Sequence, residues 1–220
     1  MAQTINTIRA QKMKEWELIV VDDGSTDSLP ELMQYYTGFD KRIKYYRFED
    51  NKGAARCRNF GNDKAEAEII CVTDCGDLYP DCKARLVYNY FKKHPETGVF
   101  TTGVNCIDHF GNLIHTQVTR PFSEGNGTRP NISHPTAAYR KWIALKWPYR
   151  ETSKHTDNYE AFFITLARNG IKFGATCKIY LKKMQLDYYK HYRDIAEARH
   201  VKKSVYKEFK VPVPDWLKKY

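Results

Sequence analysis

Short apolar runs alternate with amphipathic stretches along the first half of the chain. Residues 17–21, 44–48 and 67–73 have the length and the β-forming composition of strands, and residues 17–21 (ELIVV) are typical of a strand covered on both faces. Residues 28–36 and 54–65, which lie between these runs, have the spacing of helices. Strands that alternate with helices predict an α/β fold with a mostly parallel sheet flanked by helices.

The second half of the chain continues the pattern less regularly. Residues 81–93 are expected to form a helix and residues 99–104 a strand, whereas residues 125–135 are rich in Gly, Asn and Pro and indicate a loop. Residues 156–169 are amphipathic and end at Gly170, which predicts a helix that turns its phenylalanines toward the core.

The last part of the chain differs in charge from the rest. Residues 182–220 carry eleven Lys/Arg and five Asp/Glu, so they hold +6 of the net charge of +10. We expect one domain over residues 1–181, followed by a basic helical tail over residues 182–220. Apolar residues recur at helical spacing in that tail: Ile195, Ala198, Val201, Val205 and Phe209. Such a helix can lie on an anionic membrane, and the alternative is that its apolar stripe packs on the domain.

Composition limits the class of protein. A chain of 220 residues with 42% hydrophobic content can bury one ordinary core, and no run is long enough to predict a membrane span. The polar first residues do not resemble a signal peptide, and six cysteines without regular spacing indicate reduced thiols, so a cytoplasmic location is expected. Cys71, Cys75 and Cys82 lack the paired spacing of a zinc site and are expected to be packing thiols.

Two acidic groups follow predicted strands. Asp22 and Asp23 end the first run, and Asp74 and Asp77 end the third. Because ligands of such sheets bind at the carboxyl ends of strands, we expect these side chains to share a cleft. Neighbouring carboxylates repel unless a cation joins them, and Mg²⁺ or Mn²⁺ with a diphosphate would suit oxygen ligands. The alternative for each group is an ordinary strand-ending turn.

Four ordered segments resemble glycosyltransferase family two, whose members have the GT-A fold. WELIVVDDGSTDS (16–28) and NKGAARCRNFGNDKAEAEIICVTDCGDLYPD (51–81) carry the resemblance on the nucleotide side. NISHPTAAYRK (131–141) is similar to the family's acceptor-side segment, and HTDNYEAFFITLARNGIKF (155–173) to the segment with its catalytic base.

The resemblance implies roles for the matched nucleotide-side residues. Asp23, with Asp22 beside it, would hold the base of the nucleotide, usually uracil. Arg58 would lie near the nucleotide or its phosphates, and Asp74 opens the family's Asp-x-Asp metal motif.

On the acceptor side, the resemblance assigns Asp157 as the general base, with Glu160 as the alternative because the local spacing is one residue off the usual pattern. His134 would orient the acceptor or a phosphate, and Trp147 and Tyr149 would line the acceptor cleft. For these three residues, a structural role in a turn or in the core is an equal alternative.

Two departures from the family pattern affect these expectations. Gly76 stands where the metal motif has its second Asp, and we expect Asp77 to take the ligand role, with Gly76 giving the needed flexibility. The family's first strand, which precedes the helix begun by residues 2–11, is missing, so the resemblance implies an N-terminally truncated domain. The competing hypothesis is a degenerate protein that has lost metal affinity.

The resemblance therefore implies an inverting enzyme that uses Mn²⁺ or Mg²⁺ to transfer one sugar from a nucleotide-diphosphate donor, most simply UDP-linked, to a glycan or lipid-linked acceptor. The family's processive Gln-x-x-Arg-Trp motif is absent, which favours a single transfer. Contact of residues 182–220 with the inner face of a membrane and packing of this tail on the domain are both open alternatives, of which packing is slightly favoured. The alternative is a non-catalytic protein that binds nucleotide or sugar, while a nucleic-acid-binding role would rest on charge alone, without a recognition motif.

Overall fold

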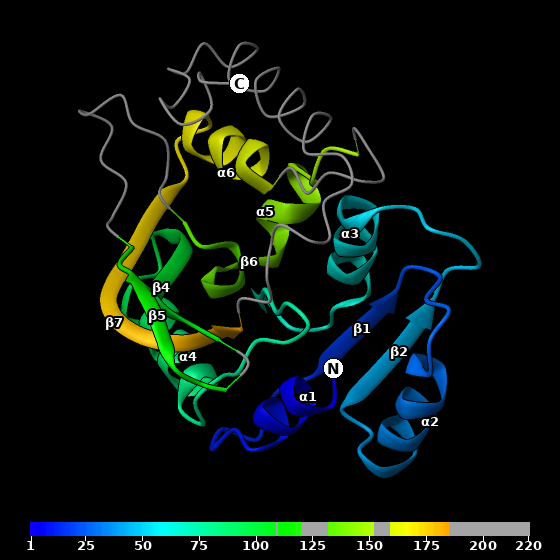
Figure 1. Ribbon diagram of the computed structural model, residues 1–220. Coiled ribbons are helices and arrows are strands. Elements are labelled where there is room, and N and C mark those ends of the chain that lie inside the picture. Colours follow the sequence, from blue (N-terminus) through cyan, green and yellow to red (C-terminus); the bar gives the residue numbers. More distant parts are fainter. Residues whose placement is uncertain (109, 120–131, 152–158, 185–220) are drawn as a thin grey trace, which may run out of the picture.

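A computed structural model describes residues 1–108, 110–119, 132–151 and 159–184 of the chain. Helices and strands alternate through the first half, and strands dominate the second (Figure 1). The elements are α1 (Ala2–Arg9), β1 (Leu18–Asp22), α2 (Leu29–Phe39), β2 (Ile43–Arg47), α3 (Ala54–Lys64), β3 (Ile69–Cys71), α4 (Lys83–Lys93), β4 (Thr97–Ile107), β5 (Leu113–Gln117), η2 (His134–Thr136), β6 (Ala138–Arg140), α5 (Lys141–Lys146), α6 (Tyr159–Arg168) and β7 (Lys172–Met184).

The described strands form two sheets that lie side by side. β1 and β2 make a parallel pair, and the second sheet has the order β3-β6-β4-β5, with β7 also paired with β4. Figure 1 shows the first pair at the lower right, with α1 and α2 beside it, and the long curved β7 on the far side of the molecule. No described strand joins the two sheets.

The expected α/β fold is confirmed, but the sheet is mixed rather than mostly parallel. Of the five strand pairings among the described residues, only β1–β2 and β4–β7 are parallel. β4 and β5 are joined by a tight turn, in which the Asp108 N–H donates to the Asn112 carbonyl (3.0 Å), and strands joined so closely must be antiparallel. The helical pattern predicted the crossovers of the first half but carried no information about this hairpin.

β1 is covered on both faces, as its apolar sequence predicts. Val20 packs with Ile5 of α1 and Met33 of α2 in a small buried cluster. On the opposite face, a methyl group added to Gly61 of α3 would lie 3.6 Å from the Val21 side chain, so β1 and α3 are in close contact there. These contacts hold the strand end that carries the acidic residues.

The larger core lies between the second sheet and the helices α5 and α6. Phe162 is 1% exposed, and its ring stacks on that of Tyr149 with the centroids 4.1 Å apart. Phe163 and Leu166 are also buried in this cluster, together with Tyr139 of β6. The sequence prediction that the phenylalanines of this helix face inward is confirmed.

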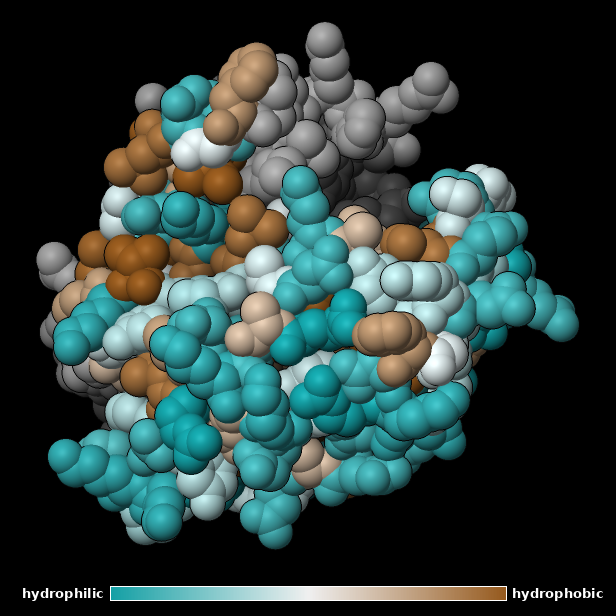
Figure 2. Space-filling model, turned by 90° about the horizontal axis from the view of Figure 1, so that it is seen from below, coloured by the Kyte–Doolittle hydropathy of each residue, from teal (hydrophilic) through white to brown (hydrophobic). Residues whose placement is uncertain are grey.

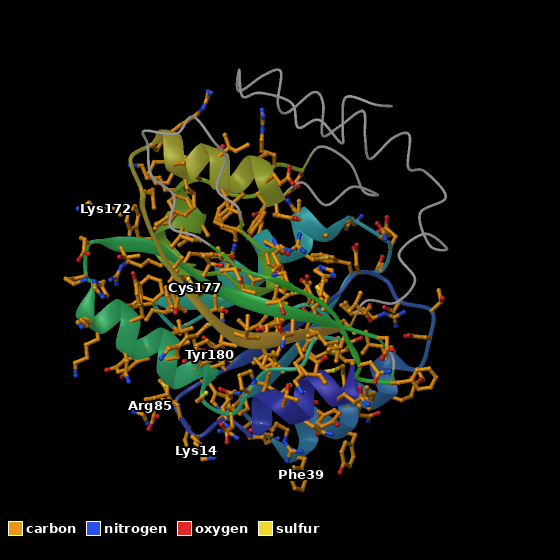
Figure 3. All side chains as sticks on the ribbon, turned by 60° about the vertical axis from the view of Figure 1, so that its left-hand side comes forward. Lys14, Phe39, Arg85, Lys172, Cys177 and Tyr180 are labelled. Atoms are coloured by element: carbon orange, nitrogen blue, oxygen red, sulfur yellow. The ribbon has the colours of Figure 1, made fainter. Side chains whose placement is uncertain are left out.

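The face of the molecule that Figure 2 shows is mainly polar, with separate hydrophobic patches. Cys177 and Tyr180 lie on β7 (Figure 3). Among the described residues, no helix is long and apolar enough to cross a bilayer. β7 runs to residue 184, and residues 185–220 lie outside the described chain, so the proposed domain boundary and the helical tail stay predictions.

We expect Phe162→Ala to lower the free energy of unfolding by about 3–5 kcal/mol, because truncation leaves a cavity in a fully packed core. Phe39→Ala is the matched control, since Phe39 is also helical but 69% exposed, and should change the value by no more than about 0.5 kcal/mol. Denaturant unfolding of both variants measures the difference, and equal effects would contradict this description of the core.

Candidate functional site

A cleft of about 470 Å³ lies at the carboxyl ends of β1 and β3. Asp23 enters it from the turn after β1, Arg58 from α3, and Asp74 from the loop after β3. Side chains of α1, including Met1 and Thr4, line the opposite wall. Three residues that the sequence assigned to one nucleotide site therefore line one hollow.

Asp22 is buried and serves the fold rather than the cleft. Its side chain is fully enclosed, and it accepts hydrogen bonds from the Ser25 N–H (2.8 Å) and the Tyr45 hydroxyl (2.5 Å), with Arg47 Nε 3.4 Å away. Burial raises the pKa of Asp22, but the hydrogen bonds from Ser25 and Tyr45 and the charge of Arg47 outweigh it, so the net pKa is lowered from 3.8. Asp22 shapes the turn that presents Asp23.

Asp23 connects two loops at the rim of the cleft. Its carboxylate accepts hydrogen bonds from the backbone N–H groups of Lys52 (2.6 Å) and Gly53 (2.9 Å), which directly precede α3. Gly24 permits this approach because its φ is +77° and a side chain there would press on the backbone of Asp50 at 3.0 Å. A carboxylate has about four acceptor positions, so Asp23 retains capacity toward a ligand in the cleft.

Arg58 lies at the centre of the site. Its guanidinium Nη2 is 3.7 Å from Asp74 Oδ1, and its Cζ lies 5.6 Å from the ring centroid of Tyr149. The Arg58 side chain is 19% exposed and that of Asp74 is 33% exposed, so both can meet a ligand. A half-buried cation beside a carboxylate is suited to an anionic group bound together with a metal.

Asp77 does not lie beside Asp74 in the cleft. It is only 2% exposed and is not among the residues lining the cleft. Burial raises the pKa of Tyr79 and of Cys106, and the nearby charge of Asp77 adds to the rise. The turn through Gly76 (φ +95°) carries Asp77 away from the cleft, toward the second sheet. The flexibility expected of Gly76 is present, but this geometry gives the Asp77 ligand hypothesis no support.

The residues present fit a divalent cation only as part of a larger set of ligands. Among the described residues, no three acidic, His or Cys side chains converge in a metal site. Mg²⁺ is commonly held by one or two carboxylates, with substrate phosphates and waters filling the other positions. Asp74 offers one such carboxylate at the cleft surface, so a cation could be held there together with a diphosphate.

His134 and Tyr149 lie inside the core instead of on an open surface. Both are 2% exposed, and His134 Nε2 and the Tyr149 hydroxyl are 3.0 Å apart. Burial, followed by the charges of Arg58 and Lys183, lowers the pKa of His134 well below 6.5, so the ring is neutral at pH 7. Trp147 is partly buried against the same core. Tyr149 and His134 therefore have the buried, structural role that the sequence analysis gave as the alternative to acceptor binding.

The general base predicted from the sequence, Asp157, lies outside the described residues. Its alternative, Glu160, stands in the first turn of α6 and is partly exposed. The choice between them therefore stays a prediction.

Sequence reasoning missed Asn59, which fastens α3 to the wall of the site. Its Nδ2 donates to the Tyr149 carbonyl (2.9 Å), and its Oδ1 accepts the Tyr149 N–H (2.9 Å). Asn59 directly follows Arg58 in the sequence, so its place in the matched segment was the only available signal.

Cys57 was also missed; burial and the charge of Asp23 raise its pKa to about 12, which keeps the thiol protonated.

A family model described as Glycosyl transferase family 2 matches residues 1–171, which is most of the chain. This chain belongs to glycosyltransferase family 2. An uncharacterized glycosyltransferase of Haemophilus influenzae is 35% identical over 80 residues, which cover 36% of this chain and 32% of that protein. The chain thus spans about a third of the length of this family relative.

Two solved structures establish the fold of this family member. S. aureus TarS in complex with UDP-GlcNAc has a TM-score of 0.73 at 17% identity, covering 97% of this chain and 64% of that one. The mannosyltransferase PcManGT from Pyrobaculum calidifontis, with GDP-Man and Mn²⁺, has a TM-score of 0.71 at 16% identity, covering 98% and 62%. The GT-A fold expected from the sequence is confirmed. At these identities the likeness concerns the fold alone.

Asp22→Asn should destabilise the protein at pH 7 by about 1–3 kcal/mol, because a buried charged acceptor is lost. Since the folded-state pKa of Asp22 is lowered, its contribution is present above pH 3.8 and is lost as the pH falls further. The difference in unfolding free energy between wild type and variant should therefore shrink below pH 3.8. Asp63→Asn, at a side chain that is 68% exposed, is the control and should show little effect at any pH; a pH-independent difference for Asp22→Asn would contradict the assignment.

Proposed function

We propose that this chain is an inverting glycosyltransferase that transfers a single sugar from a nucleotide-diphosphate donor, UDP-linked in the simplest case, to a hydroxyl of a glycan or lipid-linked acceptor. The main observation in support of this proposal is that Asp23, Arg58 and Asp74, which come from three separate segments, line one cleft. Family membership supports sugar transfer, and the neighbours solved with UDP-GlcNAc and with GDP-Man and Mn²⁺ support a nucleotide-sugar donor.

The donor would lie along the cleft with its base near Asp23 and its diphosphate near Arg58 and Asp74. The Asp23 carboxylate, already held by backbone N–H groups, would accept an N–H of the base. The Arg58 guanidinium would donate to phosphate oxygens, where a charged hydrogen bond is strongest. A bound Mn²⁺ or Mg²⁺, held by Asp74 and phosphate oxygens, would supply several kcal/mol of stabilisation to the charge that the leaving diphosphate gains.

The transfer itself needs one base and one displacement. Asp157, or Glu160 as the alternative, takes the proton of the acceptor hydroxyl while that oxygen forms a bond to the anomeric carbon. The bond from this carbon to the diphosphate breaks at the same time, its electron pair leaves with the nucleotide, and the anomeric centre is inverted. A positioned carboxylate base contributes about 10²–10⁴ in rate.

The acceptor side would be supported from within the core. His134 and Tyr149 hold each other at 3.0 Å, and Asn59 fixes the backbone of Tyr149, so these residues would position the wall that the acceptor meets.

A cytoplasmic location, and contact of residues 182–220 with the inner face of a membrane, belong to the same proposal. They rest on sequence composition and charge.

A non-catalytic, nucleotide-binding role is the second candidate, and the position of Asp77 favours it. With Asp77 buried, the described chain offers the cation one carboxylate of the expected pair. Donor hydrolysis separates the two functions: release of free sugar from UDP-GlcNAc indicates a catalyst, whereas binding without release indicates the second role.

UDP with Mn²⁺ should raise the melting temperature of the wild-type protein more than UDP alone, because a ligand that binds only the folded state stabilises it. Asp74→Asn should remove most of the Mn²⁺-dependent part of that shift. Asp63→Asn exchanges a carboxylate outside the cleft and is expected to keep the full shift. A Mn²⁺-dependent shift that survives in Asp74→Asn would show that Asp74 is not the ligand.

Asp157→Asn should lower the turnover of sugar transfer by about 10²–10⁴ while the melting shift with UDP and Mn²⁺ stays intact. Glu160→Gln, made in parallel, should retain most activity. The comparison uses single-turnover transfer from UDP-GlcNAc, and the reverse pattern in the two variants would move the role of base to Glu160.

A further inference from the structure

The buried ring of Tyr149 has a neighbour on the donor side of the cleft, the guanidinium of Arg58. The Arg58 Cζ atom lies over the ring, 5.6 Å from its centroid, and Nη2 of the same guanidinium is 3.7 Å from Asp74 Oδ1. We propose that Tyr149 is a positioning residue for donor binding, because its ring holds the Arg58 guanidinium in the orientation that meets the diphosphate. Arg58 contacts the phosphates in the proposed function, on which this inference rests.

The Arg58 side chain benefits from such a support because it is long. An arginine side chain populates many rotamers when nothing holds it, and fixing it during ligand binding costs conformational entropy. The Arg58 side chain is only 19% exposed and lines the cleft. A contact that fixes the guanidinium before the donor arrives lowers this cost and therefore strengthens binding.

Asp74 and Tyr149 act differently on the charge of Arg58. The Asp74 carboxylate offsets the positive charge, and a divalent cation bound at Asp74 would compete for the same oxygens. The ring of Tyr149 is neutral and attracts the guanidinium through its electron-rich face. This attraction requires none of the five guanidinium N–H groups, so they stay able to donate to phosphate oxygens. The ring can thus orient Arg58 without weakening its attraction for an anion.

Tyr149 is held firmly enough to act as a support. The residue is 2% exposed, its ring stacks on that of Phe162 with the centroids 4.1 Å apart, and its hydroxyl is 3.0 Å from His134 Nε2. A ring that packing and a hydrogen bond keep in one position loses little further freedom when it supports a cation.

Asn59 connects the backbone of Tyr149 to the helical turn that carries Arg58. Its Nδ2 donates to the Tyr149 carbonyl and its Oδ1 accepts the Tyr149 N–H, both at 2.9 Å. Because Asn59 directly follows Arg58 in α3, the same turn sets the place of the guanidinium stem and the place of the ring. The two hydrogen bonds therefore fix Tyr149 relative to the Arg58 backbone.

Tyr149 would act on the donor only through Arg58. It is not among the residues that line the cleft, whereas Arg58 is. Loss of the ring should therefore weaken the binding of ligands that carry the diphosphate, and should leave the binding of a nucleoside unchanged. A general defect of the fold would weaken the binding of both.

Tyr149→Leu removes the ring and should raise the dissociation constant of UDP with Mn²⁺ by about 3- to 30-fold, the range that a cation–π contact supplies. The dissociation constant of uridine, which lacks the diphosphate, should change by less than about twofold. Tyr149→Phe keeps the ring and should restore UDP binding to within about twofold of the wild type. Isothermal titration calorimetry measures these constants, and GDP with guanosine takes the place of UDP with uridine if the wild type prefers GDP.

A double-mutant cycle tests whether the effect passes through Arg58. In an Arg58→Ala background, Tyr149→Leu should cause no further loss of UDP affinity, because two residues that act as one unit are not additive. Phe163→Leu is the matched control for the core, since Phe163 is also 2% exposed and belongs to the same cluster. It should destabilise the fold without changing the affinity for UDP.

Thermal unfolding shows whether each variant is folded at the temperature of the titration. Tyr149→Met, whose flexible side chain adapts to the space of the ring, replaces Tyr149→Leu if the latter is unfolded. Equal losses for UDP and uridine, additive losses in the double variant, or unchanged UDP affinity in Tyr149→Leu would overturn the inference while the proposed function stands. If Arg58→Ala binds UDP as tightly as the wild type, the donor placement of the proposed function fails first, and the role of Tyr149 fails with it.

Discussion

The convergence of β1 and β3 at their carboxyl ends brings acidic side chains together, and the structure depends on how each negative charge is compensated. Asp22 is compensated inside the fold by the Tyr45 hydroxyl and the Ser25 N–H. Asp23 is held at the rim by the backbone N–H groups of the two residues before α3. Asp74 meets the cation of Arg58 at 3.7 Å. Asp22 is fully buried, whereas Asp23 and Asp74 line the cleft, so the last two carboxylates can meet a ligand there.

A rigid core stands behind this charged rim. A chain of hydrogen-bonded side chains runs from His134 through the hydroxyls of Tyr149 and Tyr139 to Asn62 on α3, with successive distances of 3.0, 3.4 and 3.1 Å. The aromatic packing around Phe162 surrounds it. Because buried polar groups of this kind are costly to separate, they hold α3, and with it Arg58, in register with the second sheet.

The same layout leaves the two sheets unjoined. β1 is packed on both faces by helices, yet its edge toward β3 faces a hollow, and so does the edge of β3. The hollow between the sheets shares lining residues with the cleft, including Val21, Cys57 and Arg58, so it borders the site where Asp23 and Asp74 meet.

The sequence by itself determined the local elements, because the apolar run before Asp22 and the helical spacing of apolar residues are short-range signals. The family resemblance supplied Asp23, Arg58 and Asp74, and the cleft contains all three. Only the tertiary structure decided that the sheet is mixed, that Asp77 is buried and that Cys71 is exposed. Each depends on which strand lies beside which, and strand pairing is set by long-range packing that leaves no periodic signal in the chain.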